Sequence, residues 1–286
     1  MEKNKIIDWV IRLVKGMFIG SGAILPGVSG GALAAVFGVY ERMIAFLSDI
    51  RKDFMKNVFF FIPVGIGVLS GFFLLTYPIN YFLNSSPVQT LWCFIGCIAG
   101  TFPALFKEAG KYGRKNSHLV ITGITAIVAF AGLFLAKTYM NVDVPLNPAT
   151  WVMAGAIFAL GFIVPGLSPS NFLLYMNMYE PMTKGIKDLD FSIIIPVGIG
   201  GLLCILLLSK LMGYIMKKAY APVFHFILGV VIASTAIVAP MPSEYAGISA
   251  LGIVLTVVLF LAGLALGFWM GKLDEKYKPA DESSGD

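Results

Sequence analysis

Six apolar runs, each long enough to cross a lipid bilayer, are the feature that most restricts how this chain can fold. A membrane-spanning helix needs about 20 predominantly apolar residues, with a range of roughly 17–25. The runs are continuous rather than alternating, which favours helices over the strands of a transmembrane barrel. Only 13% of the residues are charged, compared with about 25% in ordinary soluble domains. The sequence therefore predicts an all-α polytopic membrane protein, with spans at 58–76, 89–106, 118–136, 191–209, 223–240 and 248–271.

The chain also repeats itself. Residues 16–41 match 155–180 without a gap, and the identities include Pro-Gly, Ser and Tyr-Glu in the same order. The pentapeptide PVGIG occurs at 63–67 and again at 196–200. Matches of polar and turn residues in a fixed order indicate a duplication rather than a shared apolar composition. We expect a first repeat at 1–140, a second repeat at 141–273 and a polar tail at 274–286.

The positive charges divide the connections between spans into two groups. If successive spans alternate in direction and each Pro-Gly segment returns to the face it entered, eighteen of the 21 Lys and Arg residues fall on one side. The positive-inside rule makes that side cytoplasmic, with both termini there. Because each repeat holds three spans, an odd number, the two repeats are expected to be inverted relative to each other.

The Pro-Gly segments are predicted to be re-entrant helical hairpins at 16–41 and 151–180, the first preceded by an amphipathic helix in the membrane interface. The ten residues between Lys15 and Pro26 cover roughly 15 Å as a helix, about half of the hydrocarbon core. If both arms of each Pro-Gly segment crossed the membrane as full spans, the charge distribution would be the same. The re-entrant hairpin and the pair of full spans therefore both stay open. Pro26 ends the inbound helix, and the outbound helix is expected to begin near Ser29. Its exposed amides and positive dipole end would suit an anion.

The sequences around both Pro-Gly elements resemble those of a known protein family. The elements PGVSGG…GVYE and PGLSPSNFLLYMNMYE, with the spans between them, resemble the polyprenyl-phosphate translocases over almost the whole chain. The resemblance implies a transporter, not an enzyme. It would return undecaprenyl phosphate from the outer to the inner leaflet of the bacterial cytoplasmic membrane, where this carrier lipid is reused in peptidoglycan and cell-wall synthesis.

The resemblance also implies where the phosphate is held, near the middle of the membrane. The implied residues are Pro26, Gly27, Ser29, Gly30 and Gly31 in the first repeat, and Pro165, Gly166, Ser168 and Ser170 in the second. Asn171, next to the second tip, is a further candidate. The two tips are not equivalent, because Pro169-Ser170-Asn171 replaces Gly30-Gly31-Ala32.

Six residues beyond the tips are candidates for gating or coupling, and each also has a plainer interpretation. A Tyr-Glu pair commonly anchors a helix at the membrane interface, an Arg adds to the positive-inside charge, and a His packs in a core. Proton coupling of the transport is an open possibility. The candidates are Tyr40, Glu41, Arg42, Tyr179, Glu180 and His225.

Two other functions are weighed against lipid transport. A lipid pyrophosphate phosphatase shares the Pro-Gly-x-Ser signature, but Gly30 and Pro169 stand where its Arg would be, and no paired intramembrane glutamates accompany the motif. A small inorganic-anion channel or exchanger is suggested by GSGAILP at 20–26, which is similar to a loop of chloride channels. No cofactor, metal site or nucleic-acid partner is expected; the three cysteines all lie inside apolar runs.

Overall fold

The computed structural model describes residues 2–21, 30–139, 143–164 and 169–277. Every regular element within these ranges is helical. The described residues form eleven α-helices and one 3-10 helix. They are α1 (Glu2–Ser21), α2 (Gly30–Val36), α3 (Tyr40–Ser48), α4 (Phe54–Ser85), α5 (Pro87–Ala109), α6 (Asn116–Tyr139), α7 (Pro148–Ile163), α8 (Pro169–Tyr175), α9 (Tyr179–Lys187), α10 (Phe191–Val238), η1 (Pro242–Tyr245) and α11 (Ala250–Tyr277).

Five of the described helices are long and apolar enough to cross a membrane: α4, α5, α6, α10 and α11. The prediction of an all-α polytopic membrane protein is therefore confirmed. The six predicted spans fall in five helices because α10 is 48 residues long and contains two of them. Ala219, with φ −141° and ψ 48°, is non-helical and divides α10 by a kink between the predicted spans 191–209 and 223–240.

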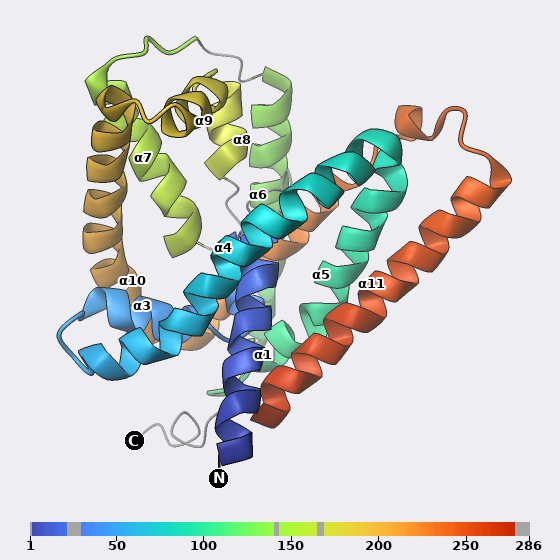
Figure 1. Cartoon of the computed structure of the whole chain (residues 1–286). Helices are drawn as coiled ribbons and strands as arrows, with labels where there is room; N and C mark the ends of the chain where they lie inside the picture. Colours follow the sequence, from blue (N-terminus) through green and yellow to red (C-terminus); the bar gives the residue numbers. More distant parts are fainter. Residues whose placement is uncertain (1, 22–29, 140–142, 165–168, 278–286) are drawn as a thin grey trace.

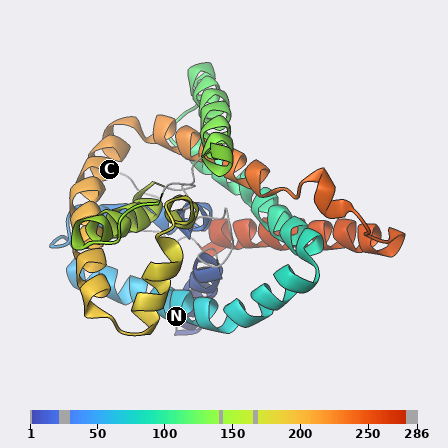
Figure 2. The same cartoon turned by 90° about the horizontal axis from the view of Figure 1, so that it is seen from above.

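The two Pro-Gly regions enter the molecule from opposite ends. Helix α1 begins at the lower end of Figure 1 and runs toward the middle, while α7 begins at the upper end and also runs toward the middle. The chain then returns, so that α3 lies at the lower end and α9 at the upper end (Figure 1). Seen from above, α10 curves around one side of the molecule with α7 against it, and α6 and α11 lie at the periphery (Figure 2).

The chain after each Pro-Gly region forms two short helices, which corrects the prediction of a single outbound helix. Helix α2 ends at Val36 and α3 begins at Tyr40, and Gly38 between them has a φ of +68°. The amide of Val39 donates to the carbonyl of Ala34, and that of Gly38 to the carbonyl of Ala35, which is the Schellman arrangement with Gly38 in the left-handed position.

The second half repeats this turn. Asn177, which aligns with Gly38, has a φ of +52° and ends α8 with the corresponding pair of hydrogen bonds. Asn is the residue other than glycine that most readily adopts this conformation. Helices α8 and α9 thus begin and end at the positions aligned with the bounds of α2 and α3.

The repeated pentapeptide PVGIG is a helix-packing element. In the first half, a Cβ added at Gly67 of α4 would overlap the carbonyl oxygen of Leu13 in α1, so the two helices are in backbone contact there. In the second half, a Cβ at Gly200 of α10 would overlap the carbonyl oxygen of Val152 in α7. Close backbone approach at small residues is the usual way in which helices associate in a membrane. The same crossing therefore joins α1 to α4 in the first half and α7 to α10 in the second.

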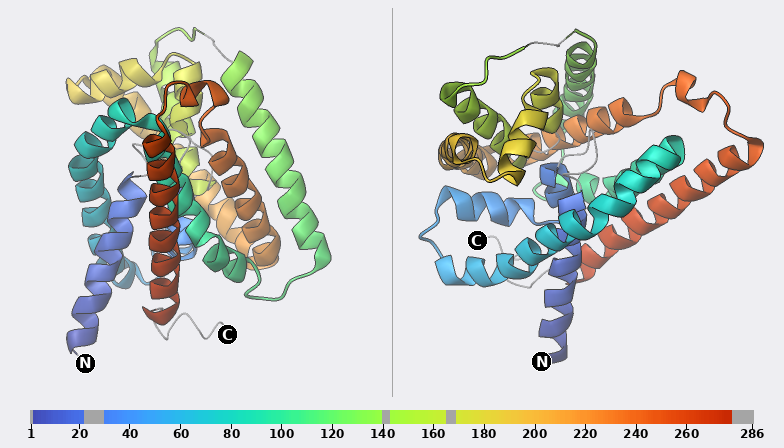
Figure 3. Two further views of the ribbon diagram at one scale, coloured as in Figure 1. Left: turned by 90° about the vertical axis from the view of Figure 1, so that its right-hand side faces the viewer. Right: turned by 45° about the horizontal axis from the view of Figure 1, so that its top comes forward.

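Helix α1 is continuous from Glu2 to Ser21, so the predicted interfacial helix and inbound arm are a single element. It begins at the same end of the molecule at which α11 finishes, as the side view also shows (Figures 1 and 3). The α3–α4 connection, the α5–α6 connection and the kink of α10 lie at this end as well (Figure 1). We call it the basic end, because these segments carry Arg51, Lys52, Lys111, Arg114, Lys115, Lys217 and Lys218.

Candidate functional site

Most of the predicted phosphate-binding residues fall outside the described ranges. These are Pro26, Gly27, Ser29, Pro165, Gly166 and Ser168. The structure describes the backbone of Ser170 and Asn171 at the start of α8, but their side chains lie outside its description. What it does describe are the flanks of both tips, including Gly30 and Gly31 on one side and the end of α7 on the other.

These flanks meet in the middle of the molecule. A Cβ added at Gly31, the second residue of α2, would overlap the carbonyl oxygen of Gly161 near the end of α7. Gly30 is less restricted, because its Cβ would lie 3.3 Å from the carbonyl oxygen of Ile19. Only a residue without a side chain allows α2 to approach α7 this closely, which accounts for glycine at position 31.

Tyr40 makes a second link between the two halves. Its side chain is fully buried, and its hydroxyl donates a hydrogen bond to the carbonyl oxygen of Ile163, the last residue of α7. The last carbonyls of a helix have no partner within the helix, so this bond satisfies one of them. Tyr179, which aligns with Tyr40, is only partly buried and makes no comparable hydroxyl bond to the described residues.

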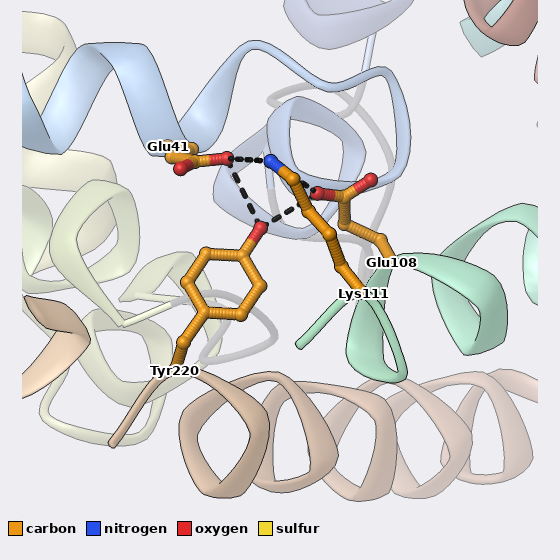
Figure 4. Close-up of polar contacts among 4 residues, drawn as sticks. All are labelled: Glu41, Glu108, Lys111 and Tyr220. Carbon is orange, nitrogen blue, oxygen red and sulfur yellow. Dashed lines mark hydrogen bonds and ion pairs between the residues drawn. The ribbon is translucent and has the colours of Figure 1, made fainter. Parts of the chain in front are cut away.

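Glu41, the next residue, belongs to a polar cluster at the basic end (Figure 4). Its Oε2 lies 3.0 Å from the hydroxyl oxygen of Tyr220, just beyond the kink of α10, and 3.4 Å from Nζ of Lys111. The same hydroxyl lies 2.6 Å from Oε1 of Glu108, near the end of α5. Burial disfavours the charged form of Lys111, but the charges of Glu41 and Glu108 outweigh it and raise the pKa of this ammonium.

The second half has no such cluster in its described part. Glu180, the counterpart of Glu41, is exposed at the start of α9, and its carboxylate has no hydrogen-bond or ion-pair partner among the described residues. The two Tyr-Glu pairs, identical in sequence, therefore have different surroundings.

Arg42 lies over the ring of Phe60, 3.9 Å from the ring centroid, and its Nε donates to the side-chain oxygen of Asn57. The guanidinium of Arg12 lies over the same ring at 4.4 Å and is paired with Asp8. Cations over an aromatic face are held in place by the ring quadrupole. Arg42 is thus fixed at the basic end, close to the cavities described next.

Two adjoining cavities open at the basic end, with volumes of about 780 and about 600 Å³. Both are lined by Glu41, Tyr112 and Lys217. The larger is also lined by Tyr220 and His118, and the smaller by Arg42 and Lys111. A cavity of this size with several cationic side chains is suited to an anionic group.

His225, the last gating candidate, is fully buried in α10. Its Nδ1 lies 2.8 Å from the carbonyl oxygen of Ala221, and its Nε2 has no hydrogen-bond partner among the described residues. Its ring centroid is 5.3 Å from that of His118. The described residues contain no group of three or more His, Cys, Asp or Glu side chains that could hold a metal ion.

Comparison with known proteins supports the resemblance seen in the tips. A family described as undecaprenyl phosphate translocase-like matches residues 19–251. A protein of Staphylococcus aureus named polyprenyl-phosphate transporter is 27% identical over 270 residues, covering 90% of this chain and 95% of its own length. One of Vibrio cholerae with the same name is 23% identical over 250 residues, covering 81% of this chain and 78% of its own. No solved structure matches this chain.

The relatives are named as transporters, and this agrees with the expectation that the protein is not an enzyme. The family match extends over far more than half of the chain and includes both Pro-Gly tips, both PVGIG pentapeptides and the polar cluster. The chain therefore belongs to the undecaprenyl phosphate translocase-like family.

Proposed function

We propose that this protein transports a polyprenyl phosphate, undecaprenyl phosphate, from the outer to the inner leaflet of the bacterial cytoplasmic membrane. The names of its relatives support the substrate class. In this role the protein would return the carrier lipid to the cytoplasmic face, where cell-envelope synthesis consumes it.

The observation that carries the proposal is the meeting of the two Pro-Gly regions. Gly31 packs against Gly161, and Tyr40 is bonded to Ile163, so the flanks of both tips come together between the two ends of the molecule. A site formed at this junction would lie between the two halves, where transporters built from repeats hold their substrates.

We place the phosphate at this junction. Its binding groups would be the backbone amides and hydroxyls of Pro26–Gly31 and Pro165–Asn171. Phosphate oxygens accept several hydrogen bonds at once, which suits such groups. Because α2 and α8 have only seven residues each, the amides and hydroxyls, rather than a long helix dipole, would supply the binding. The prenyl tail would stay in the lipid.

We infer an alternating-access mechanism between two inverted repeats, each a re-entrant hairpin followed by three spans. The entry of α1 and α7 from opposite ends and the two PVGIG crossings are consistent with this arrangement. The basic end would face the cytoplasm, with both termini there, because eighteen of the 21 Lys and Arg residues are assigned to this side and only Lys137, Lys184 and Lys187 to the other.

The decisive experiment measures undecaprenyl phosphate exposed on intact bacteria with a probe for lipid phosphate in the outer leaflet. Cells lacking the protein are expected to expose more of this lipid, and the double variant Ser29→Ala, Gly30→Leu is expected not to reverse the change. The matched control is Ser117→Ala, Gly123→Leu, in which both residues are exposed on α6 and a Cβ at Gly123 meets no atom within 4 Å. This control should restore the wild-type exposure.

Unchanged exposure in cells that lack every such transporter would reject the lipid proposal. In that event, measurement of inorganic-anion flux in vesicles that contain the purified protein tests the alternative of a small-anion channel or exchanger. Movement of polyprenyl phosphate indicates the lipid transporter, and movement of inorganic anions indicates the channel or exchanger.

A further inference from the structure

The two cavities at the basic end adjoin each other, and together we call them the basic vestibule. Glu41, Tyr112 and Lys217 line both cavities, and so do Ala45 and Ser48 of α3. Helix α3 therefore borders both cavities. The rest of the lining comes from α1, α4, α6, α10 and the connections between helices at this end.

The vestibule carries an excess of positive charge. Among the described residues, nine cationic side chains and three carboxylates line it. Two further carboxylates, Asp8 and Glu108, are paired with lining cations, and the excess remains when they are counted. A cleft lined mainly by one sign of charge concentrates ions of the opposite sign. The lining cations are Arg12, Arg42, Lys52, Lys56, Lys111, Arg114, Lys115, Lys217 and Lys218, and the lining carboxylates are Glu41, Asp49 and Asp53.

Two of these cations converge on one aromatic ring. The guanidinium carbon of Arg42 lies 3.9 Å from the ring centroid of Phe60, and that of Arg12 lies 4.4 Å from it. Phe60 is buried and packs edge-on against Phe61, so the ring is a fixed support. Stacking engages the face of a guanidinium, whose N–H groups project from its edge in a fork that matches a phosphate. The positive-inside rule requires only that a charge lie on the cytoplasmic side, so it does not account for this convergence.

The smaller cavity lies where α4 enters its apolar span, near the expected boundary between lipid headgroups and hydrocarbon. The span begins at Phe54, so Asn57 and Phe60 occupy its first two turns. Phe59 also lines this cavity and is 65% exposed, and Ile62, one turn further along α4, is exposed too. Cationic and exposed apolar side chains thus lie beside each other. This combination suits a phosphate that carries an apolar chain better than it suits a free phosphate.

The vestibule is linked by a short stretch of chain to the junction of the two halves. Gly38, in the turn between α2 and α3, lines the smaller cavity. Tyr40, which is bonded to Ile163 at the junction, directly precedes Glu41 and Arg42. Helix α2 has seven residues and is therefore about 10 Å long. A phosphate that leaves the junction toward the basic end has to move by about the length of α2 to reach the vestibule.

We propose that the basic vestibule is a second binding site, for a lipid phosphate monoester, with Arg12 and Arg42 as its principal ligands. The two guanidinium groups bind the phosphate oxygens, the surrounding lysines balance its remaining charge, and the apolar chain passes Phe59 into the lipid. A monoester is favoured over a phosphodiester because it carries up to about two negative charges at neutral pH. The role of the vestibule as the place from which the transported lipid leaves rests on the proposed function, whereas the binding itself does not.

Binding is tested with the purified full-length protein and a polyprenyl monophosphate that carries a photoreactive diazirine in its first isoprene unit. Mass spectrometry of the cross-linked peptides is expected to find label at residues 54–62 of α4. Unlabelled polyprenyl phosphate should remove this label, whereas phosphatidylglycerol or inorganic phosphate at the same concentration should not. Absence of label at residues 54–62 would overturn the proposal. Equal competition by phosphatidylglycerol or by inorganic phosphate would overturn it as well.

Charge-conserving substitutions separate a guanidinium site from a general effect of positive charge. Arg42→Lys is expected to raise the lipid concentration needed for labelling by about tenfold, which corresponds to the loss of one charge-assisted hydrogen bond. Arg12→Lys should act in the same direction, because lysine lacks the stacked fork. Arg51→Lys is the matched control, since Arg51 is exposed in the α3–α4 connection and lines neither cavity.

The control should label as wild type does, and wild-type labelling of both Arg12→Lys and Arg42→Lys would contradict the guanidinium site. Thermal unfolding in detergent shows beforehand which variants are folded. If one of the two is not, the other keeps the test available.

Transport in vesicles distinguishes failure of this site from failure of the proposed function. If wild type is labelled at residues 54–62 but does not move polyprenyl phosphate, the proposed function fails and the site stands. If wild type moves the lipid while Arg12→Lys and Arg42→Lys label as wild type does, the site fails and the proposed function stands. When both hold, the two variants should move the lipid more slowly than Arg51→Lys. Weak labelling with a wild-type rate of movement would contradict the release role.

Discussion

Tyr40 and Tyr179 occupy aligned positions and yet have different roles in packing. The hydroxyl of Tyr40 satisfies the last carbonyl of α7, whereas Tyr179 is only partly buried and lacks such a bond within the described residues. We predict that Tyr40→Phe lowers the free energy of unfolding by about 1–3 kcal/mol, because the buried carbonyl of Ile163 loses its partner. Thermal or denaturant unfolding in detergent measures the change.

Tyr179→Phe is the control for that prediction. It removes the same hydroxyl from the aligned position and should have a much smaller effect. Equal effects of the two substitutions would mean that the bond to Ile163 contributes nothing beyond the burial of the ring.

The sequence identified Tyr40 and Glu41 as residues of interest because the Tyr-Glu pair is repeated. It did not identify Glu108 or Tyr220, and Lys111 was noticed only as one of many basic residues. The reason is physical: Tyr220 lies 179 positions from Glu41, and the two meet only because α3 packs against the kinked helix. Among local signals, the pair of Glu108 and Lys111 three residues apart at the end of a span was the only one available.

At the scale of elements, the glycines of PVGIG differ within each copy. The second glycine, Gly67 or Gly200, contacts the backbone of the inbound arm, while a Cβ at the first, Gly65 or Gly198, meets no atom within 4 Å. We predict that Gly67→Ala and Gly200→Ala each destabilise the protein by about 1–3 kcal/mol through overpacking of the helix crossing. Unfolding of the purified variants provides the measurement.

The first glycines serve as internal controls in the same helices. Gly65→Ala and Gly198→Ala should leave stability unchanged or raise it by up to about 1 kcal/mol, because Ala is the better helix former. If Gly65→Ala were as damaging as Gly67→Ala, the crossing would not explain the repeated motif.

The long helices could be predicted from the sequence, but the breaks within and between helices could not. The spans follow from the apolar runs, so five long helices appear where six runs were found. The break at Gly38 was missed, because the apolar pattern continues across it and only the left-handed glycine marks the end of α2. The sequence predicts a connection between two separate spans at 210–222, whereas the structure continues the helix through it and interrupts it only at the kink at Ala219; no Pro or Gly occupies position 219, and Pro222 follows three residues later.

At the scale of the whole molecule, the segments that the positive charges assign to one side of the membrane also lie at one end of the structure. The connections counted as one side by their Lys and Arg content lie at the basic end, together with the start of α1 and the end of α11 (Figures 1 and 3). Lys184 and Lys187 lie in α9 at the opposite end, where Asp188 and Asp190 follow them. The distribution predicts that the basic end faces the cytoplasm.

This orientation is tested by single cysteines in a variant whose three native cysteines are replaced by Ala. A membrane-impermeant thiol reagent applied to intact cells should label Ser85→Cys and Ser243→Cys, which are exposed at the end opposite the basic end. Lys52→Cys and Ser117→Cys, exposed at the basic end, should react only after the membrane is permeabilised. The reverse pattern would invert the orientation, with the basic end outside the cell. Labelling of all four sites in intact cells would contradict a fixed orientation and the alternation of spans on which the inverted repeat depends.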